Sequence, residues 1–169
     1  AAQAVKAQVE LPDTFSIGGS HQVNSQWRVL ADYTWTGWSS IQSLDIQSAS
    51  TGARVTGVEL KFEDSWRVGL GAEYQLNQPW LLRTGLAYDR SPVQDEYRTP
   101  RLPDSDRIWL AFGARYQPGP TMWFDFGYTY LFVDDASSQL QPPGPLPGTL
   151  NGTYKGDVQV LGVQATLRF

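Results

Sequence analysis

Hydrophobic and polar residues alternate along much of this chain, and the alternation is clearest between positions 122 and 133. In "MWFDFGYTYLFV", aromatic residues fill every second position from Phe124 to Phe132, and mostly small or polar residues stand between them. A β-strand directs successive side chains to opposite faces, so this segment predicts a strand with one aromatic and one polar face. Two environments remain open, because a soluble sandwich would bury the aromatic face and a membrane barrel would turn it toward lipid.

The same alternation recurs along the chain and predicts seven strands and no convincing helix. We expect these strands at about residues 11–22, 27–38, 59–76, 80–90, 107–117, 121–133 and 157–169. The pattern therefore predicts an all-β fold with antiparallel neighbours.

The connections between these strands are of two kinds. Short turns rich in Asn, Pro and Gly, such as 76–79, alternate with long polar connections at 39–57, 90–106 and 134–157. The third long connection includes "QPPGPLPG" (141–148), which predicts a proline-rich surface segment. A strict alternation of short turns and long connections is typical of outer-membrane barrels.

Two features of the apolar face favour the membrane barrel over the soluble sandwich. In the six clearer strands, this face carries no Asp, Glu, Lys or Arg. Aromatic residues stand at both of its margins, as in the girdles of a lipid-facing barrel: Trp27, Trp35, Trp66, Tyr74, Trp80, Tyr88, Tyr116 and Phe169. We therefore predict an antiparallel transmembrane β-barrel of the bacterial outer membrane. Because single-chain bacterial barrels normally have an even number of strands, seven strands predict the C-terminal part of a larger barrel.

Composition narrows the possible functions. The 169 residues suit one domain, and the net charge of −4 provides no basic patch for nucleic acid. The absence of cysteine excludes a thiolate nucleophile and cysteine-ligated zinc. The single histidine, His21, is expected near a short turn and away from any lumenal Ser–acid pair, which argues against an enzyme. We expect no cofactor, and we interpret the acidic residues of the second long connection as solvated charge rather than a calcium site.

Four segments then carry a family resemblance: "LPDTFSIGGSHQVNSQWRVLADYTWTGWSS" (11–40), "TGLAYDRSPV" (84–93), "LPDSDRIWLAFGARYQ" (102–117) and "GTYKGDVQVLGVQATLRF" (152–169). In this order and spacing they resemble the FadL family, outer-membrane transporters of long-chain fatty acids and related hydrocarbons. The resemblance implies a fourteen-stranded barrel with an N-terminal hatch plugging the lumen, of which this chain supplies the last seven strands.

The resemblance also implies a function and partners. We expect passive, ligand-gated uptake of long-chain fatty acids, or alternatively of aromatic hydrocarbons, with lateral release into the membrane. The implied partners are the hydrophobic ligand, the lipid bilayer with its lipopolysaccharide, and the missing N-terminal half of the barrel. A different class of function is also open, namely a structural or adhesive barrel whose extracellular loops bind a surface partner.

Charged residues on the polar face are the candidates for a ligand site in the lumen. A base backed by an apolar slot suits the carboxylate of a fatty acid, and Lys61 and Arg67 are placed in the extracellular half of their strand. The lumenal ligand-binding candidates are Lys61, Glu63, Arg67, Asp89, Arg107 and Trp109. The alternative is that these charges pair across strands and brace the wall. Four further residues match family motifs, and we expect them to anchor a long connection: Ser91, Pro92, Asp104 and Asp106.

Overall fold

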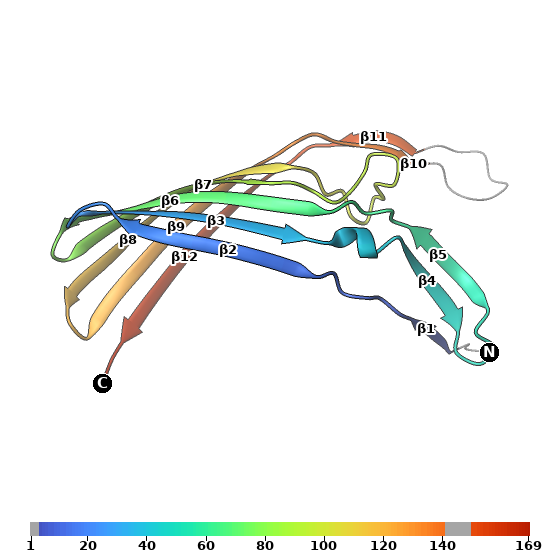
Figure 1. The fold of residues 1–169 in the computed structure, drawn as a ribbon, viewed down its shortest axis with the longest axis horizontal. Helices are drawn as coiled ribbons and strands as arrows, with labels where there is room; N and C mark the ends of the chain where they lie inside the picture. The colour runs from blue at the N-terminus through green and yellow to red at the C-terminus, as the bar shows by residue number, and fades with distance from the viewer. Residues whose placement is uncertain (1–3, 141–149) are drawn as a thin grey trace.

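The computed structural model describes residues 4–140 and 150–169, and its main element is a curved seven-stranded antiparallel sheet (Figure 1). The strand order is β12-β9-β8-β7-β6-β3-β2. The strands are β2 (Thr14–Gln22), β3 (Trp27–Thr36), β6 (Ser65–Asn77), β7 (Trp80–Asp89), β8 (Arg107–Gly119), β9 (Met122–Val133) and β12 (Asp157–Leu167). The all-β antiparallel fold predicted from the alternation is confirmed.

The two kinds of connection lie at opposite ends of this sheet. Figure 1 shows the short turns at one end, with the C-terminus beside them, and the long connections at the other end. The proline-rich segment 141–148 lies outside the described residues. Strands β2 and β12 form the two edges of the sheet, so the described residues make an open section of wall rather than a closed barrel.

The long connections contain structure of their own that alternation over seven strands did not predict. The first carries the 3₁₀ turn η1 (Trp38–Ser40) and the hairpin β4 (Ser43–Ser48) and β5 (Arg54–Glu59), which pairs with β1 (Val5–Ala7). The third carries the hairpin β10 (Ala136–Leu140) and β11 (Leu150–Tyr154). Among the described residues, no helix is long and apolar enough to cross a membrane.

The structure divides the segment 59–76, which the sequence predicts to be a single strand. Glu59 ends β5, and β6 begins only at Ser65. Between them the chain folds back, since the amides of Leu60 and Lys61 both donate to the Gln42 carbonyl at 2.9 Å, and Lys61 has a φ of 41°. Phe62 explains the break, because its side chain is buried in a small core between the connections instead of alternating across the sheet.

The cross-strand register places the predicted apolar residues on one face. Trp35 pairs with Trp66, and Trp80 pairs with Tyr116, so these rings project from the same side of the sheet. Large apolar side chains on this face are open to the surroundings: Leu70 is 62% exposed and Leu161 is 78% exposed. Large apolar side chains exposed along one whole face of a sheet are typical of a lipid-facing wall rather than of a soluble domain.

One residue departs from the prediction that the apolar face carries no charge. Asp157 pairs with Phe132 across β12 and β9, which puts its side chain on the apolar side at the long-connection end. The Tyr130 hydroxyl donates to Asp157 at 2.8 Å, and the Tyr128 hydroxyl lies 3.1 Å from the side-chain oxygen of Gln159. These contacts satisfy the polar groups at the margin of the face, where the aromatic side chains supply hydroxyl groups.

Candidate functional site

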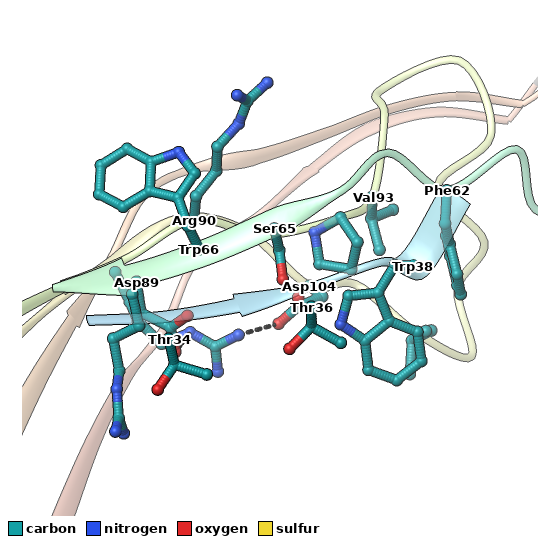
Figure 2. Close-up of a pocket in the computed structure, with 14 residues that line it drawn as sticks. Thr34, Thr36, Trp38, Phe62, Ser65, Trp66, Asp89, Arg90, Val93 and Asp104 are labelled. Carbon is teal, nitrogen blue, oxygen red and sulfur yellow. Dashed lines mark hydrogen bonds and ion pairs between the residues drawn. The ribbon is translucent and has the colours of Figure 1, made fainter. Parts of the chain in front are cut away.

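A concave pocket of about 490 Å³ lies where β3, β6 and β7 meet the long connections (Figure 2). Its volume falls within the range of about 300–1,000 Å³ that is usual for small-molecule sites. Figure 2 shows Trp38, Phe62 and Val93 gathered at one end and Thr34 and Asp89 at the other. The pocket therefore has an apolar end and a polar end.

The apolar end is built by side chains of the long connections. Phe62 and Val93 are 7% and 8% exposed and form a small core with Ile41. Trp38 stands edge-on to Phe62 with ring centroids 6.0 Å apart, and Leu102 adds a further apolar wall. Burial of Ile41, Phe62 and Val93 gives the connections a fixed arrangement without a hydrogen-bonded ladder.

The polar end is a single row of neighbouring residues on four strands. Thr34 of β3 pairs with Arg67 of β6, Arg67 pairs with Asp89 of β7, and Asp89 pairs with Arg107 of β8. The row lies on the face opposite the exposed apolar residues, which is the lumenal face of a barrel wall. Three of the six ligand-binding candidates from the sequence, Arg67, Asp89 and Arg107, therefore come together and line the pocket.

The arginines of the pocket are all paired with carboxylates. Arg67 Nη2 lies 3.3 Å from Asp32 Oδ1, and Arg107 Nη2 lies 2.7 Å from Asp104 Oδ1. Arg107 also lies 3.6 Å from Asp89, and Arg90 lies 3.0 Å from Glu63. A ligand carboxylate would therefore compete with a carboxylate of the protein for each guanidinium group.

Three of the four predicted loop-anchoring residues, Ser91, Asp104 and Asp106, join the start of the second long connection to its end, and Pro92 contacts the approach to β6. The Ser91 amide donates to Asp106 at 2.8 Å, and the Ser91 hydroxyl donates to Asp104 at 2.7 Å. The Pro92 carbonyl accepts a 3.0 Å hydrogen bond from the Glu63 amide. These bonds tie residues 91 and 92 to the beginning of β8 and to the approach to β6.

The other three ligand-binding candidates do not line this pocket. Lys61 lies on the backbone turn between β5 and β6, and its Nζ donates to the Tyr97 hydroxyl at 2.9 Å. This hydrogen bond raises the pKa of Lys61 above its ordinary value, with a smaller contribution from Glu59. Glu63 extends to Arg90, and Trp109 lies one lumenal row closer to the short turns, between Ala87 and Leu131.

From the pocket toward the short turns, the residues on the lumenal face differ in size and charge from row to row. After the row that contains Trp109 and Leu131 comes a groove of about 530 Å³ that Arg83 and Asp125 line together with small residues: Gly85, Ala111, Gly113, Gly127 and Gly162. Gly113 pairs with Gly127, and Gly127 pairs with Gly162. The backbone is open to the lumen at Gly127 and Gly162, whereas the side chain of Arg83 lies beside Gly113.

A network of ion pairs lies beside these glycines, because Arg83 pairs with Gly113, and it extends one row further toward the short turns at Arg115 and Asp125. Arg83 lies 3.1 Å from Glu73 and 3.0 Å from Asp125, and Arg115 lies 2.8 Å from Asp125. Arg28 joins the network through Glu73 at 3.5 Å. This network links side chains on five strands. It is the kind of cross-strand pairing expected from the sequence as the alternative to ligand binding for lumenal charges.

The sequence reasoning missed most of the apolar end of the pocket. Phe62, Val93 and Leu102 lie in segments that were interpreted as a strand or as a polar connection. The available signal was an isolated apolar residue amid polar neighbours, which does not distinguish a loop core from a solvent-exposed side chain.

Comparison with known proteins agrees with the barrel geometry. The family described as "Outer membrane protein transport protein (OMPP1/FadL/TodX)" matches residues 1–169. The chain is 33% identical over 131 residues to the long-chain fatty acid transport protein of Escherichia coli K12, covering 78% of this chain and 29% of that protein. It is 36% identical over 121 residues to outer membrane protein P1 of Haemophilus influenzae, covering 72% and 26%.

Solved structures show the same fold. A FadL homologue of Pseudomonas aeruginosa superimposes with a TM-score of 0.89 at 31% identity, covering 96% of this chain and 37% of that one. The toluene transporter TbuX of Ralstonia pickettii gives a TM-score of 0.60 at 20% identity, covering 98% and 36%, a likeness of fold alone. The chain thus spans 26% to 37% of the length of these four proteins.

Proposed function

Because this chain belongs to the outer-membrane protein transport family of FadL and TodX, we propose that it forms the ligand-capturing part of a barrel that carries hydrophobic compounds across the outer membrane. The predicted location in the bacterial outer membrane is confirmed by the same family match. The Escherichia coli and Ralstonia pickettii proteins described above are named as transporters, and the Haemophilus influenzae protein is named as an outer membrane protein.

The pocket at the long-connection end is the observation that carries this proposal. Its apolar end, with Trp38, Phe62 and Val93, suits a hydrocarbon, and its polar end opens onto the lumenal row that contains Arg67 and Arg107. Binding a hydrophobic compound removes apolar surface from water at about 25 cal/mol per Å², which supplies affinity without a covalent or energised step. Capture between the long connections followed by entry into the lumen is therefore a passive process.

The wall below the pocket supports a path for such a compound. At Gly127 and Gly162 no side chain projects into the lumen, and a Cβ added at either position would meet nothing within 4 Å. A compound that leaves the pocket passes these glycines on β9 and β12 beside the ion-pair network, since Arg83 lies in the same row of the sheet. Lateral release into the membrane remains part of the proposal, as the family resemblance implies.

The substrate class follows from the charge of the pocket. A long-chain fatty acid is the first candidate, because the polar end of the pocket contains the two basic residues Arg67 and Arg107. An aromatic hydrocarbon is the second candidate, because both arginines already have carboxylate partners and a neutral ligand does not compete for them. Oleate and toluene are the corresponding probes.

The barrel context supplies the remaining partners. The aromatic rows at the two margins, such as the Trp27–Tyr74 pair at 4.6 Å and the Trp66–Tyr88 pair at 5.3 Å, suit the lipid and lipopolysaccharide interfaces. The unpaired edges of β2 and β12 need strand partners in lipid, since an unsatisfied backbone group there costs several kcal/mol. The other half of the same barrel is the partner we propose for them.

A pocket-filling variant of the full-length protein tests the proposal. Thr36 lines the pocket from β3, so Thr36→Trp places an indole in the cavity without removing an existing contact of the apolar end. Thr56→Trp makes the same change on the exposed hairpin β4–β5 and is the matched control.

We expect Thr36→Trp to weaken binding of oleate or toluene at least about tenfold, a loss of about 1.4 kcal/mol, in titrations of the detergent-solubilised protein. Thr56→Trp should bind as the wild type does. If Thr36→Trp leaves both affinities unchanged, the pocket is not the capture site.

A further inference from the structure

Arg98 is the most deeply buried charged residue among those that the structure describes, and it lies in the second long connection rather than in the lumen. Only 3% of its surface is exposed, although its side chain carries a full positive charge. A buried charge is costly unless it is paired and fully hydrogen-bonded. The partners of Arg98 therefore indicate what its burial accomplishes.

The guanidinium group donates hydrogen bonds to backbone carbonyls near the start and near the end of the second long connection. Nε donates to the Asp104 carbonyl at 2.9 Å, and Nη2 donates to the Val93 carbonyl at 3.2 Å. Val93 and Asp104 also contribute to the wall of the ligand pocket. One side chain thus holds two pocket residues that are eleven positions apart in the sequence.

The same group reaches the third long connection. Nη1 donates to the Asp95 carboxylate and to the carbonyl of Ser137 on β10. In return, the Ser138 hydroxyl donates to the Arg98 carbonyl at 2.7 Å, and the Gln139 amide donates to the Asp95 carbonyl at 3.3 Å. Ser138 is itself only 1% exposed, so its hydrogen bond to Arg98 is buried between the two connections, whereas the side chain of Asp95 lies at their surface with 59% exposed.

No regular strand or helix holds the second connection in place. Residues 90–106 contain turns and extended segments only, so side-chain contacts must fix the arrangement of the backbone. A buried arginine with several backbone acceptors fixes such an arrangement better than apolar contacts, because its hydrogen bonds are directional and its loss leaves several carbonyls unpaired. The planar fork of the guanidinium group also matches acceptors on different segments, which a lysine ammonium does not.

We propose that Arg98 is the positioning residue of the ligand pocket and that it couples the pocket wall to the β10–β11 hairpin as one cooperative unit. The inference rests on the proposed function, because it assigns a binding role to the wall that Arg98 holds. The unit consists of residues 91–106 and the strand β10. When Arg98 releases its acceptors, both segments loosen together, and a bound compound leaves more quickly.

The test compares variants of the full-length protein in detergent micelles. Arg98→Gln removes the charge and most donors, and Arg98→Lys keeps the charge without the fork. Arg101→Gln is the matched control, because Arg101 lies three residues further along the same connection and is exposed. Two measurements are made on each variant: hydrogen exchange of backbone amides, and the dissociation rate of oleate and of toluene.

In Arg98→Gln we expect exchange to accelerate about tenfold or more at Val93 and at Gln139 together, while amides of the seven long strands keep their protection. Dissociation of the probe should accelerate by about 10- to 100-fold with little change in association, because affinity changes within one site reside mostly in the dissociation rate. Arg98→Lys should fall between wild type and Arg98→Gln, and Arg101→Gln should match the wild type.

Several outcomes would overturn the inference. Faster exchange in residues 91–106 without any change at Gln139 would refute the coupling, and an unchanged dissociation rate in Arg98→Gln would refute the positioning role. If Arg98→Gln does not fold, Arg98→Lys and Ser138→Ala carry the same comparison, since Ser138→Ala removes only the bond to the Arg98 carbonyl. If the wild type binds neither probe, the proposed function fails, whereas the exchange data still decide whether the two connections are coupled.

Discussion

The pairing of Arg67 with Asp32 leads to a sharp prediction about which ligands the pocket accepts. Asp32→Asn removes the carboxylate that lies 3.3 Å from Arg67 Nη2 but preserves the shape of the side chain. The positive charge of Arg67 then becomes available to a ligand carboxylate. We expect oleate to bind more tightly to Asp32→Asn, whereas oleyl alcohol, which has the same chain without the charge, should bind as before.

The magnitude follows from the distance and exposure of the pair. Two unit charges about 4 Å apart interact by about 1 kcal/mol in water and by about 4 kcal/mol at the effective dielectric of a protein surface. The side chains of Arg67 and Asp32 are 44% and 48% exposed, so solvent screens most of this interaction. We therefore expect a gain of about 0.5–1 kcal/mol, or about two- to fivefold in affinity.

Competition titrations of the full-length protein measure this change. Oleate and oleyl alcohol are compared at low and at moderate ionic strength, because the Debye length falls to about 10 Å at 0.1 M salt and the gain should shrink accordingly. Asp45→Asn is the matched control, since Asp45 pairs with Arg54 at 2.8 Å on the β4–β5 hairpin and carries a similar exposure. An oleate-to-alcohol affinity ratio that is the same in wild type and Asp32→Asn at low salt would refute the view that Asp32 competes with the ligand.

Three further predictions concern the loops, the ion-pair network and a glycine of the lumenal wall. Hydrogen bonds from the side chain and backbone of Ser39 lower the pKa of Asp64 below its ordinary 3.8. Their stabilising effect is therefore present above about pH 4 and is lost as the pH falls through the lowered pKa; the protection factor of the Ser39 amide should drop there, and Asp64→Asn should abolish that pH dependence. Arg83→Gln leaves Glu73 and Asp125 without their shared partner, so urea unfolding in lipid vesicles should show a loss of about 1–2 kcal/mol. Arg28→Gln, at the more exposed end of the network, should lose less than half of that stability, because Arg28 pairs with one carboxylate of the described residues, that of Glu73. Equal losses in the two variants would contradict the view that Arg83 contributes more because it joins two carboxylates. Gly127→Leu adds a side chain where a Cβ has nothing within 4 Å, so the protein should fold and bind oleate within about twofold of wild type. Its rate of oleate uptake into cells should nevertheless fall several-fold, and an unchanged uptake rate would remove Gly127 from the transport path.

Periodicity alone determined the main features of this fold. A strand repeats every two residues, and the chain alternates faithfully in segments such as 122–133, so both the strands and their faces follow from local sequence. The three neighbours Arg67, Asp89 and Arg107 were also identified as site candidates, because the alternation assigns each of them to the polar face of its own strand. Outer-membrane location follows from the same signal, since alternation with aromatic margins is the pattern that a lipid-facing wall requires.

Tertiary structure alone decided how the long connections fold and what they enclose. The alternation predicts that Lys61 lies within a strand. Burial of Phe62 turns the backbone at that point instead, and the Lys61 side chain donates to the Tyr97 hydroxyl. The sequence pattern did not single out Arg98, and only its contacts with Val93, Asp104 and Ser137 give it a structural role. Two of these contacts join residues far apart in the sequence: Lys61 and Tyr97 are 36 positions apart, and Arg98 and Ser137 are 39. Such contacts compete across many possible loop arrangements. Local pattern carries no information about such contacts, whereas a strand's pleat imposes its period on every residue it contains.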